Sequence, residues 1–176
     1  MTGRLGEIKN SLRCSAMLNL NQHSPQSYFL KGGTMSGFVA YKSIVDPSDC
    51  DFLGHMNVSK YFAACSDSVF ALQAELGLTA DDMRSGRKLS FAVVHADSNF
   101  LAELSAGEAI QMESEILEVG TKSMTFSHKL VRVADGEPAF TTVFKCVLLN
   151  LQTRRAEVIP QEIVERSENW MAKNED

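Results

Sequence analysis

Residues 49–62, DCDFLGHMNVSKYF, place carboxylates, a thiol, an imidazole and an amide directly before an apolar segment with helical spacing. Asp51 can act as a nucleophile or as a general base, and His55 is a second candidate base. Asn57 is a favoured helix N-cap, because its side-chain oxygen can accept a hydrogen bond from the first turn. Amides of that turn lack a partner inside the helix and carry the positive end of its dipole. We therefore expect a carboxylate and a group of amides to lie close together.

Each of these residues also has a structural interpretation. Asp51 can simply brace the loop, and a loop histidine such as His55 is more often a hydrogen-bonding brace than a base. Cys50 and His55 are poor candidates for a nucleophile–base pair, because residues so close in sequence rarely project to one point. To hold a metal, Asp51 and His55 would need at least one further protein ligand, and none is suitably spaced. We expect neither a metal nor a redox cofactor.

Apolar spacing predicts the helix that follows this segment. From Val58 to Leu76, apolar residues recur at steps of three or four, and Gly77 is a natural helix end. Alanines and Phe70 fill positions off the main apolar stripe. A helix that is apolar on most of its circumference is expected to be enclosed by other structure.

The remaining sequence predicts strands and a final helix. In the second strand, His95 is in phase with Phe91 and Val93, so we expect a hydrogen-bonded histidine in the interior. Ile159-Pro160 opens the last helix. The strands are expected over residues 37–46, 90–104, 109–119, 123–133 and 139–151.

A strand, a long helix and four antiparallel strands define an α+β architecture. A flat sheet cannot cover a long helix, so the sheet of about five strands must curve around it. Residues 1–36 are expected to form a flexible N-terminal extension, residues 37–159 the main domain, and residues 160–176 a C-terminal helix and tail. Exposed sheet edges favour pairing with a second copy of the chain.

Composition excludes several classes of function. The net charge of −5 argues against a nucleic-acid partner and against an anionic membrane. No apolar run approaches the roughly 20 residues of a membrane-spanning helix. The four cysteines show neither paired spacing nor a disulfide framework, so we expect reduced thiols in a cytoplasmic protein.

The order of elements and the segment DCDFLGHMNVSKY resemble the hotdog-fold acyl-CoA thioesterases of the 4-hydroxybenzoyl-CoA thioesterase type. In that family an acidic loop leads into the central helix, and the likeness covers residues 37–151. The positions that match its loop pattern are Asp51, Gly54, His55, Asn57 and Tyr61. A second, weaker match is EVGTKSMTFSH, residues 118–128, where Lys122 and Ser123 would lie near the bound thioester and CoA.

The resemblance implies hydrolysis of an acyl-CoA to a carboxylic acid and free CoA. Asp51 would act as nucleophile or as general base, and both versions occur in the family. The Val58 N–H would hold the thioester oxygen, and Gly54 would let the loop turn sharply. Tyr61 and Phe62 would help to line the substrate site. The protein would work as a homodimer or homotetramer, with each site at a subunit boundary.

Other functions remain open at this point. An acyl-carrier-protein thioesterase would use the same chemistry, although the acidic body of this chain would repel an acidic carrier. A non-catalytic hotdog module that binds acyl-CoA is a further alternative, but it would have no need of a carboxylate at Asp51. The absence of a G-x-S-x-G motif disfavours an α/β-hydrolase. Related dehydratases carry an arrangement similar to D-x-N-P-x-H. This sequence lacks that arrangement, which disfavours a dehydratase.

Overall fold

The computed structural model describes residues 38–173, so the extension predicted over residues 1–36 lies outside the described part. A five-stranded antiparallel sheet forms the body of the molecule, in the order β1-β3-β4-β5-β2. The strands are β1 (Phe38–Ile44), β2 (Leu89–Phe100), β3 (Ala109–Val119), β4 (Ser123–Arg132) and β5 (Pro138–Asn150). The helices are η1 (Pro47–Asp49), α2 (Val58–Glu75), α3 (Ala80–Arg84) and α4 (Gln161–Lys173).

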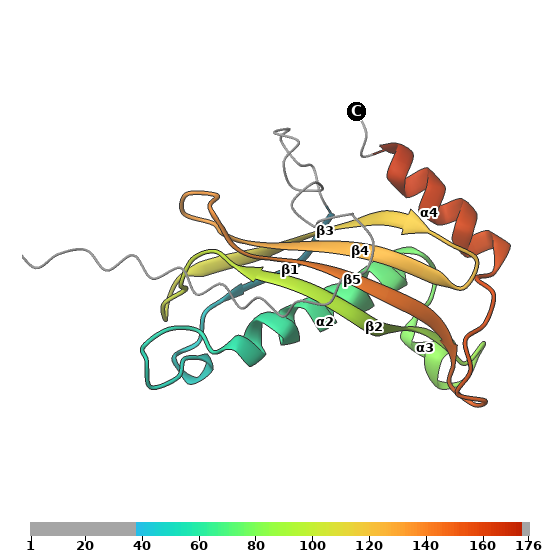
Figure 1. The fold of residues 1–176 in the computed structure, drawn as a ribbon, viewed down its shortest axis with the longest axis horizontal. Coiled ribbons are helices and arrows are strands. Elements are labelled where there is room, and N and C mark those ends of the chain that lie inside the picture. The colour runs from blue at the N-terminus through green and yellow to red at the C-terminus, as the bar shows by residue number, and fades with distance from the viewer. Residues whose placement is uncertain (1–37, 174–176) are drawn as a thin grey trace, which may run out of the picture.

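The long helix α2 lies along one face of the curved sheet (Figure 1). Its buried stripe includes Tyr61, Cys65, Val69 and Leu72, and Gly77 follows the helix with a φ of +86° that favours glycine. The predicted α+β architecture is therefore confirmed. Among the described residues, no helix is both long enough and apolar enough to cross a lipid bilayer.

The core of the sheet is formed by alternate side chains along its strands. In β3, the residues that face α2 are buried and their neighbours are partly open. Ser114 of β3 and His128 of β4 belong to this buried face, with 2.8 Å between Ser114 Oγ and His128 Nδ1. Burial lowers the pKa of His128 to about 3, so the imidazole is neutral near pH 7.

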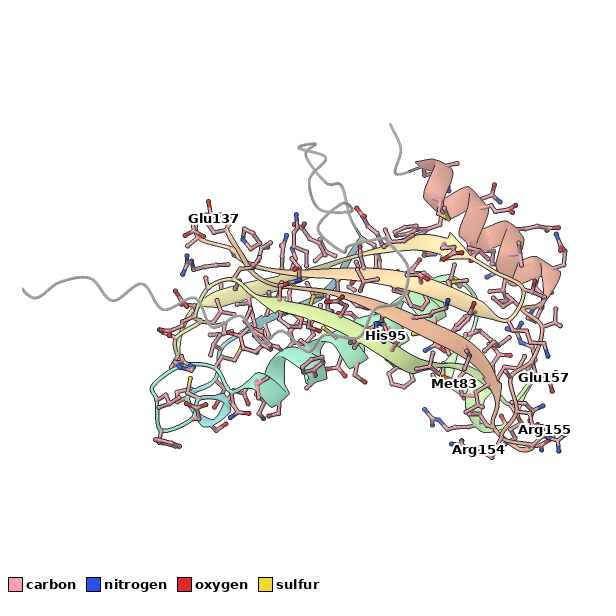
Figure 2. The ribbon with its side chains drawn as sticks, viewed as in Figure 1. Met83, His95, Glu137, Arg154, Arg155 and Glu157 are labelled. Carbon is pink, nitrogen blue, oxygen red and sulfur yellow. The ribbon has the colours of Figure 1, made fainter. Side chains whose placement is uncertain are left out.

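The prediction for His95 is wrong. The pairing of β2 with β5 shifts by one residue between Val93 and His95, which marks a β-bulge. An extra residue in a strand reverses the face on which later side chains lie. His95, labelled on β2 in Figure 2, is consequently exposed. It pairs with Lys145 rather than with a core position.

Within residues 38–173, α2 is enclosed only in part. Val58, Phe62 and Phe70 are exposed by 53%, 36% and 50% respectively. Phe62 nevertheless packs on Phe100, Phe140 and Phe144 of the sheet, so it lies at the margin of the covered side of α2 and not opposite to it. The sheet therefore leaves these apolar side chains partly open among the described residues. Such a row of exposed apolar side chains along α2, which is called the exposed side of α2 below, is unusual in an isolated chain.

The direction of α2 relative to β2 determines where each end of the helix lies. Near the start of α2, the ring of Tyr61 packs on Phe100 at the end of β2, with 5.3 Å between ring centroids. Near the end of α2, Gln73 Oε1 accepts a hydrogen bond of 2.8 Å from Phe91 N, close to the start of β2. The helix and the edge strand therefore run antiparallel, and the loop before α2 lies at the opposite end of the sheet from α3 (Figure 1).

Candidate active site

A tight loop between η1 and α2 holds the carboxylate of Asp51. Oδ1 accepts a hydrogen bond of 2.9 Å from Leu53 N, and Oδ2 accepts one of 3.2 Å from Asn57 Nδ2. The backbone closes the loop, because Asp51 N donates to His55 O at 3.1 Å. The carboxylate is thus fixed from two sides while remaining partly exposed.

Gly54 makes this loop possible. Its φ is +90°, a conformation that side-chain-bearing residues rarely adopt, and its N–H donates to Asp51 O at 3.0 Å. A methyl group built on Gly54 would meet no atom within 4 Å. Backbone conformation, rather than space, therefore requires glycine here.

The first turn of α2 lies directly beside the carboxylate. Asn57 is the N-cap, as predicted, and its Oδ1 accepts a hydrogen bond of 3.0 Å from Ser59 N. Within residues 38–173, no acceptor bonds to the N–H of Val58, the first residue of the helix. Because Asn57 contacts Asp51 and precedes Val58, an unpaired amide and a carboxylate occupy the same small region.

His55 does not bond to the carboxylate of Asp51 through its ring. Its Nε2 lies 3.9 Å from Glu103 Oε1, a distance too long for a strong hydrogen bond. The His55 side chain is 29% exposed, and its backbone oxygen is the group that bonds to Asp51. This arrangement fits the bracing role better than the role of a base.

The two aromatic residues predicted to line the substrate site differ in exposure. Tyr61 is only 4% exposed and packs between Phe100 and Phe140, and burial is the main reason that its pKa rises to about 12. Its ring belongs to the core, so the placement gives no support to the predicted contact with substrate. Phe62 packs on Phe100, Phe140 and Phe144 as well, but 36% of it remains exposed, so part of its ring is accessible.

Lys122 and Ser123 are not brought to Asp51 within one chain. Ser123 pairs with Val147, which in turn pairs with Ala92 near the start of β2. The Asp51 loop lies beyond the other end of that strand, roughly 25 Å away along the sheet. Lys122 Nζ donates to Ala156 O at 3.1 Å.

Several contacts of the site were not predicted from the sequence. The bond from Asn57 Nδ2 to Asp51 gives the N-cap a second task. Lys60 Nζ forms an ion pair of 2.7 Å with Asp49, which ties the first turn of α2 to η1. The spacing of an acid before a helix and a lysine in its first turn is a weak signal for such a pair. Among residues 38–173, no three His, Cys, Asp or Glu side chains cluster in a way that suits a metal ion.

A curved antiparallel sheet packed on a long central helix is a hotdog-type architecture. The sequence matches the thioesterase-like superfamily over residues 45–167. The chain therefore belongs to this superfamily, and it is a thioester hydrolase. The search of curated proteins returned no match.

Solved structures share the fold at low sequence identity. A hypothetical protein from Staphylococcus aureus, solved in complex with CoA, has a TM-score of 0.71 and 21% identity, covering 81% of this chain and 89% of its own. A 1,4-dihydroxy-2-naphthoyl-CoA thioesterase from Synechocystis has a TM-score of 0.65 and 15% identity, covering 74% and 96%. A thioesterase superfamily protein from Jannaschia has a TM-score of 0.70 and 19% identity, covering 77% and 94%. The predicted hotdog fold is confirmed.

Proposed function

We propose that the protein hydrolyses acyl-CoA thioesters, with Asp51 as the catalytic carboxylate and the Val58 N–H as the donor to the thioester oxygen. The observation that carries this proposal is the bond from Asn57 Nδ2 to Asp51 Oδ2, because Asn57 is also the N-cap of α2. One side chain thus holds a carboxylate beside the Val58 N–H, which has no hydrogen-bond acceptor among the described residues. The CoA bound to the Staphylococcus aureus protein and the naphthoyl-CoA substrate of the Synechocystis enzyme support CoA as the thiol part of the substrate.

The chemistry needs an attacking oxygen and a place for the developing oxyanion. In one route Asp51 removes a proton from water, and the resulting hydroxide attacks the carbonyl carbon. In the other, a carboxylate oxygen attacks and forms a mixed anhydride that water then hydrolyses. In both routes the C–S bond breaks, the thiolate leaves and takes up a proton, and the products are a carboxylic acid and CoA.

The amide at the helix N-terminus would stabilise the transition state in either route. A backbone N–H aimed at the carbonyl oxygen is fixed before the reaction, and the helix dipole adds positive potential there. Gly54 and His55 support this arrangement by shaping the loop. Phe62 would contact the acyl part of the substrate, and Lys122 and Ser123 would meet CoA from the partner subunit.

We further propose a homodimer formed through the edge strand β2. Among the described strands, β2 pairs only with β5, and it carries the exposed side chains of Val93 and Val94. Pairing of β2 with its copy would extend the sheet and bring the exposed sides of the two α2 helices together. The free thiols of Cys50, Cys65 and Cys146 fit a reducing compartment, and we place the protein in the cytoplasm.

The test compares Asp51→Asn with wild type in a free-thiol release assay over short, medium, long and aromatic acyl-CoAs. Asparagine keeps the size and the acceptor for Leu53 N but cannot act as nucleophile or base. We expect turnover to fall by about a hundredfold or more while the unfolding midpoint stays within a few degrees of wild type. Near-normal turnover in this variant would remove Asp51 from the mechanism.

A further inference from the structure

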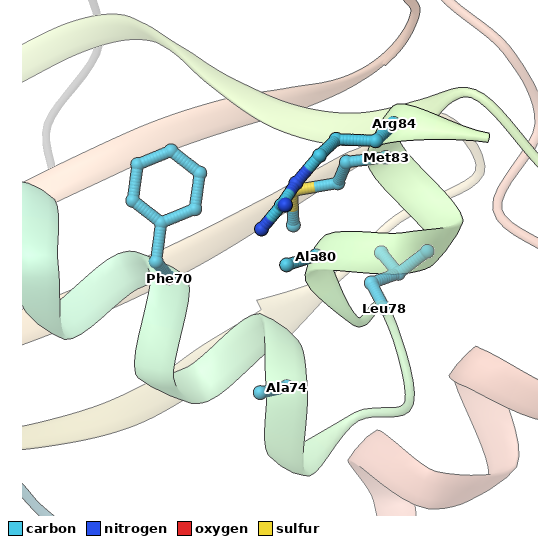
Figure 3. A pocket seen from close by; sticks show the side chains of 6 residues that line it. All are labelled: Phe70, Ala74, Leu78, Ala80, Met83 and Arg84. Atoms are coloured by element: carbon cyan, nitrogen blue, oxygen red, sulfur yellow. The ribbon is translucent and has the colours of Figure 1, made fainter. Parts of the chain in front are cut away.

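An apolar pocket opens between the end of α2 and α3. It has a volume of about 340 Å³ and is lined by Phe70, Ala74, Leu78, Ala80, Met83 and Arg84 (Figure 3). Ligand pockets in proteins measure roughly 300–1,000 Å³ and combine an apolar lining with a few polar groups. This α2–α3 pocket is therefore large enough for a small or medium-sized organic group.

Arg84 is the charged group of the α2–α3 pocket. Its guanidinium extends from α3 toward Phe70, across the space between the two helices (Figure 3). Within residues 38–173, no acidic side chain pairs with Arg84, whereas the neighbouring Arg87 pairs with both Asp82 and Glu162. An unpaired guanidinium beside an apolar lining suits a ligand that has an apolar body and an anionic end.

Within one chain, the α2–α3 pocket is far from the catalytic carboxylate. The pocket lies at the end of α2, near the start of β2, because Gln73 bonds to Phe91. The Asp51 loop precedes the other end of α2, which packs on the end of β2. Figure 1 shows α3 and the loop before α2 at opposite ends of the sheet, and the pocket beside α3 is consequently remote from the loop.

The proposed two-fold pairing of β2 reverses this relation. In an antiparallel pair of identical strands, the start of one strand lies beside the end of the other. The end of α2 and α3 of the partner then face the start of α2 in the first protomer. The exposed side chains of Val58, Phe62 and Phe70 supply an apolar path between the two regions.

We propose that the α2–α3 pocket of each protomer receives the acyl group hydrolysed by the Asp51 loop of its partner, and that Arg84 selects acyl groups ending in a carboxylate. This inference rests on the proposed function and on the proposed dimer. It assigns the substrate class as CoA thioesters of medium-length dicarboxylic acids. The apolar lining holds the methylene chain, and the guanidinium pairs with the distal carboxylate.

The first experiment compares octanoyl-CoA with octanedioyl-CoA, which differ at the distal end. Wild type is expected to have the higher kcat/KM for octanedioyl-CoA, and Arg84→Met is expected to lower the ratio of the two values by about tenfold. Arg84→Lys keeps the charge and should retain part of the preference. Lys42→Met removes one charge from β1, at the opposite edge of the sheet from β2, and should leave the ratio unchanged.

The outcomes separate this inference from the function on which it rests. If wild type hydrolyses none of the acyl-CoAs, the proposed function is wrong and this inference with it. If wild type hydrolyses both substrates without preferring the dicarboxylic one, or if Arg84→Met keeps the wild-type ratio, only the role of Arg84 is wrong. An equal fall of the ratio in Lys42→Met would assign the preference to overall charge and would also contradict that role.

A heterodimer tests whether the pocket serves the partner. Chains carrying Asp51→Asn and chains carrying Arg84→Met are given different tags, co-expressed and purified as mixed dimers. If the pocket serves the partner, one of the two sites is intact, and the turnover of octanedioyl-CoA is about half that of wild type. If the pocket serves its own chain, no site is intact and turnover is about half that of the Arg84→Met dimer. The second result, or a monomeric protein, would overturn the inference.

Discussion

Replacement of Asn57 separates two tasks of one side chain. Its Oδ1 caps α2 by accepting from Ser59 N, and its Nδ2 donates to Asp51 Oδ2. Serine is a good N-cap but has no amide group, whereas alanine can perform neither task. We therefore expect Asn57→Ser to keep the stability of the wild type and lose turnover, and Asn57→Ala to lose both.

The structure sets the expected magnitudes. Loss of an N-cap costs about 1 kcal/mol, which lowers the unfolding midpoint by about 2–4 °C in a domain of this size. A hydrogen bond to a charged group contributes about 1.5–3 kcal/mol. The bond from Asn57 to Asp51 is partly buried and 3.2 Å long, so the lower end of that range applies. This corresponds to a loss of about tenfold in kcat/KM, since about 1.4 kcal/mol is one factor of ten.

Two measurements on the same preparations are needed. Thermal unfolding at one fixed protein concentration gives the midpoint, because the midpoint of a dimer depends on concentration. Thiol release from the best acyl-CoA substrate gives kcat/KM. Wild-type activity in Asn57→Ser would refute the positioning of Asp51 by the amide. Equal stability of the serine and alanine variants would refute the capping argument.

Three further outcomes are expected from other parts of the structure. Gly54→Ala and Gly136→Ala each force a side chain into a positive φ, and each should lower the free energy of unfolding by about 1 kcal/mol in urea. Only Gly54→Ala should reduce kcat. An equal effect of both variants on activity would contradict the role of the loop. The pKa of His128 is about 3 in the folded state and about 6.5 in the unfolded state, so the unfolded state binds the proton first as the pH falls. The free energy of unfolding should therefore fall below pH 6.5, by up to about 1.4 kcal/mol per pH unit. Urea midpoints at pH 7 and pH 5 should show this slope in wild type and a smaller one in His128→Asn, and identical slopes would contradict it. Val94→Lys at the β2 edge should sediment as a monomer with unchanged circular dichroism and little turnover, and a persisting dimer would rule out pairing through β2.

Elements with strong local signals were predicted well from the sequence. Asn57 and Gly77 bound α2 because their preferences, for capping and for positive φ, depend on the adjacent backbone alone. The alternation of β3 survives in the structure for a similar reason, since each second residue meets the core. His128 of β4 is buried in the same way, on the face that it shares with Phe126 and Leu130.

Features that depend on distant residues were not predictable in this way. The bulge that exposes His95 arises from a shift of pairing with β5, and nothing in the alternation before it marks the position. The separation of Lys122 from Asp51 follows from the pairing registers of β4, β5 and β2, which place Ser123 beside the start of β2, whereas the Asp51 loop lies beyond its end. The contact between Asn57 and Asp51 depends on the path of a loop whose turn Gly54 permits but does not specify.

Exclusion of water connects the dimer to the chemistry. The Val58 amide would stabilise an oxyanion more strongly in a site without water, because hydrogen bonds and dipoles act more strongly at low dielectric. In the single chain the Val58 side chain is 53% exposed, and Phe52 and Leu53, next to Asp51, are exposed by 98% and 65%. The described residues leave this region open to solvent, and in the proposed dimer the partner and the acyl group would complete the enclosure. Separation of the protomers should therefore lower kcat itself, and a variant that raised KM alone while becoming monomeric would argue against a site shared between them.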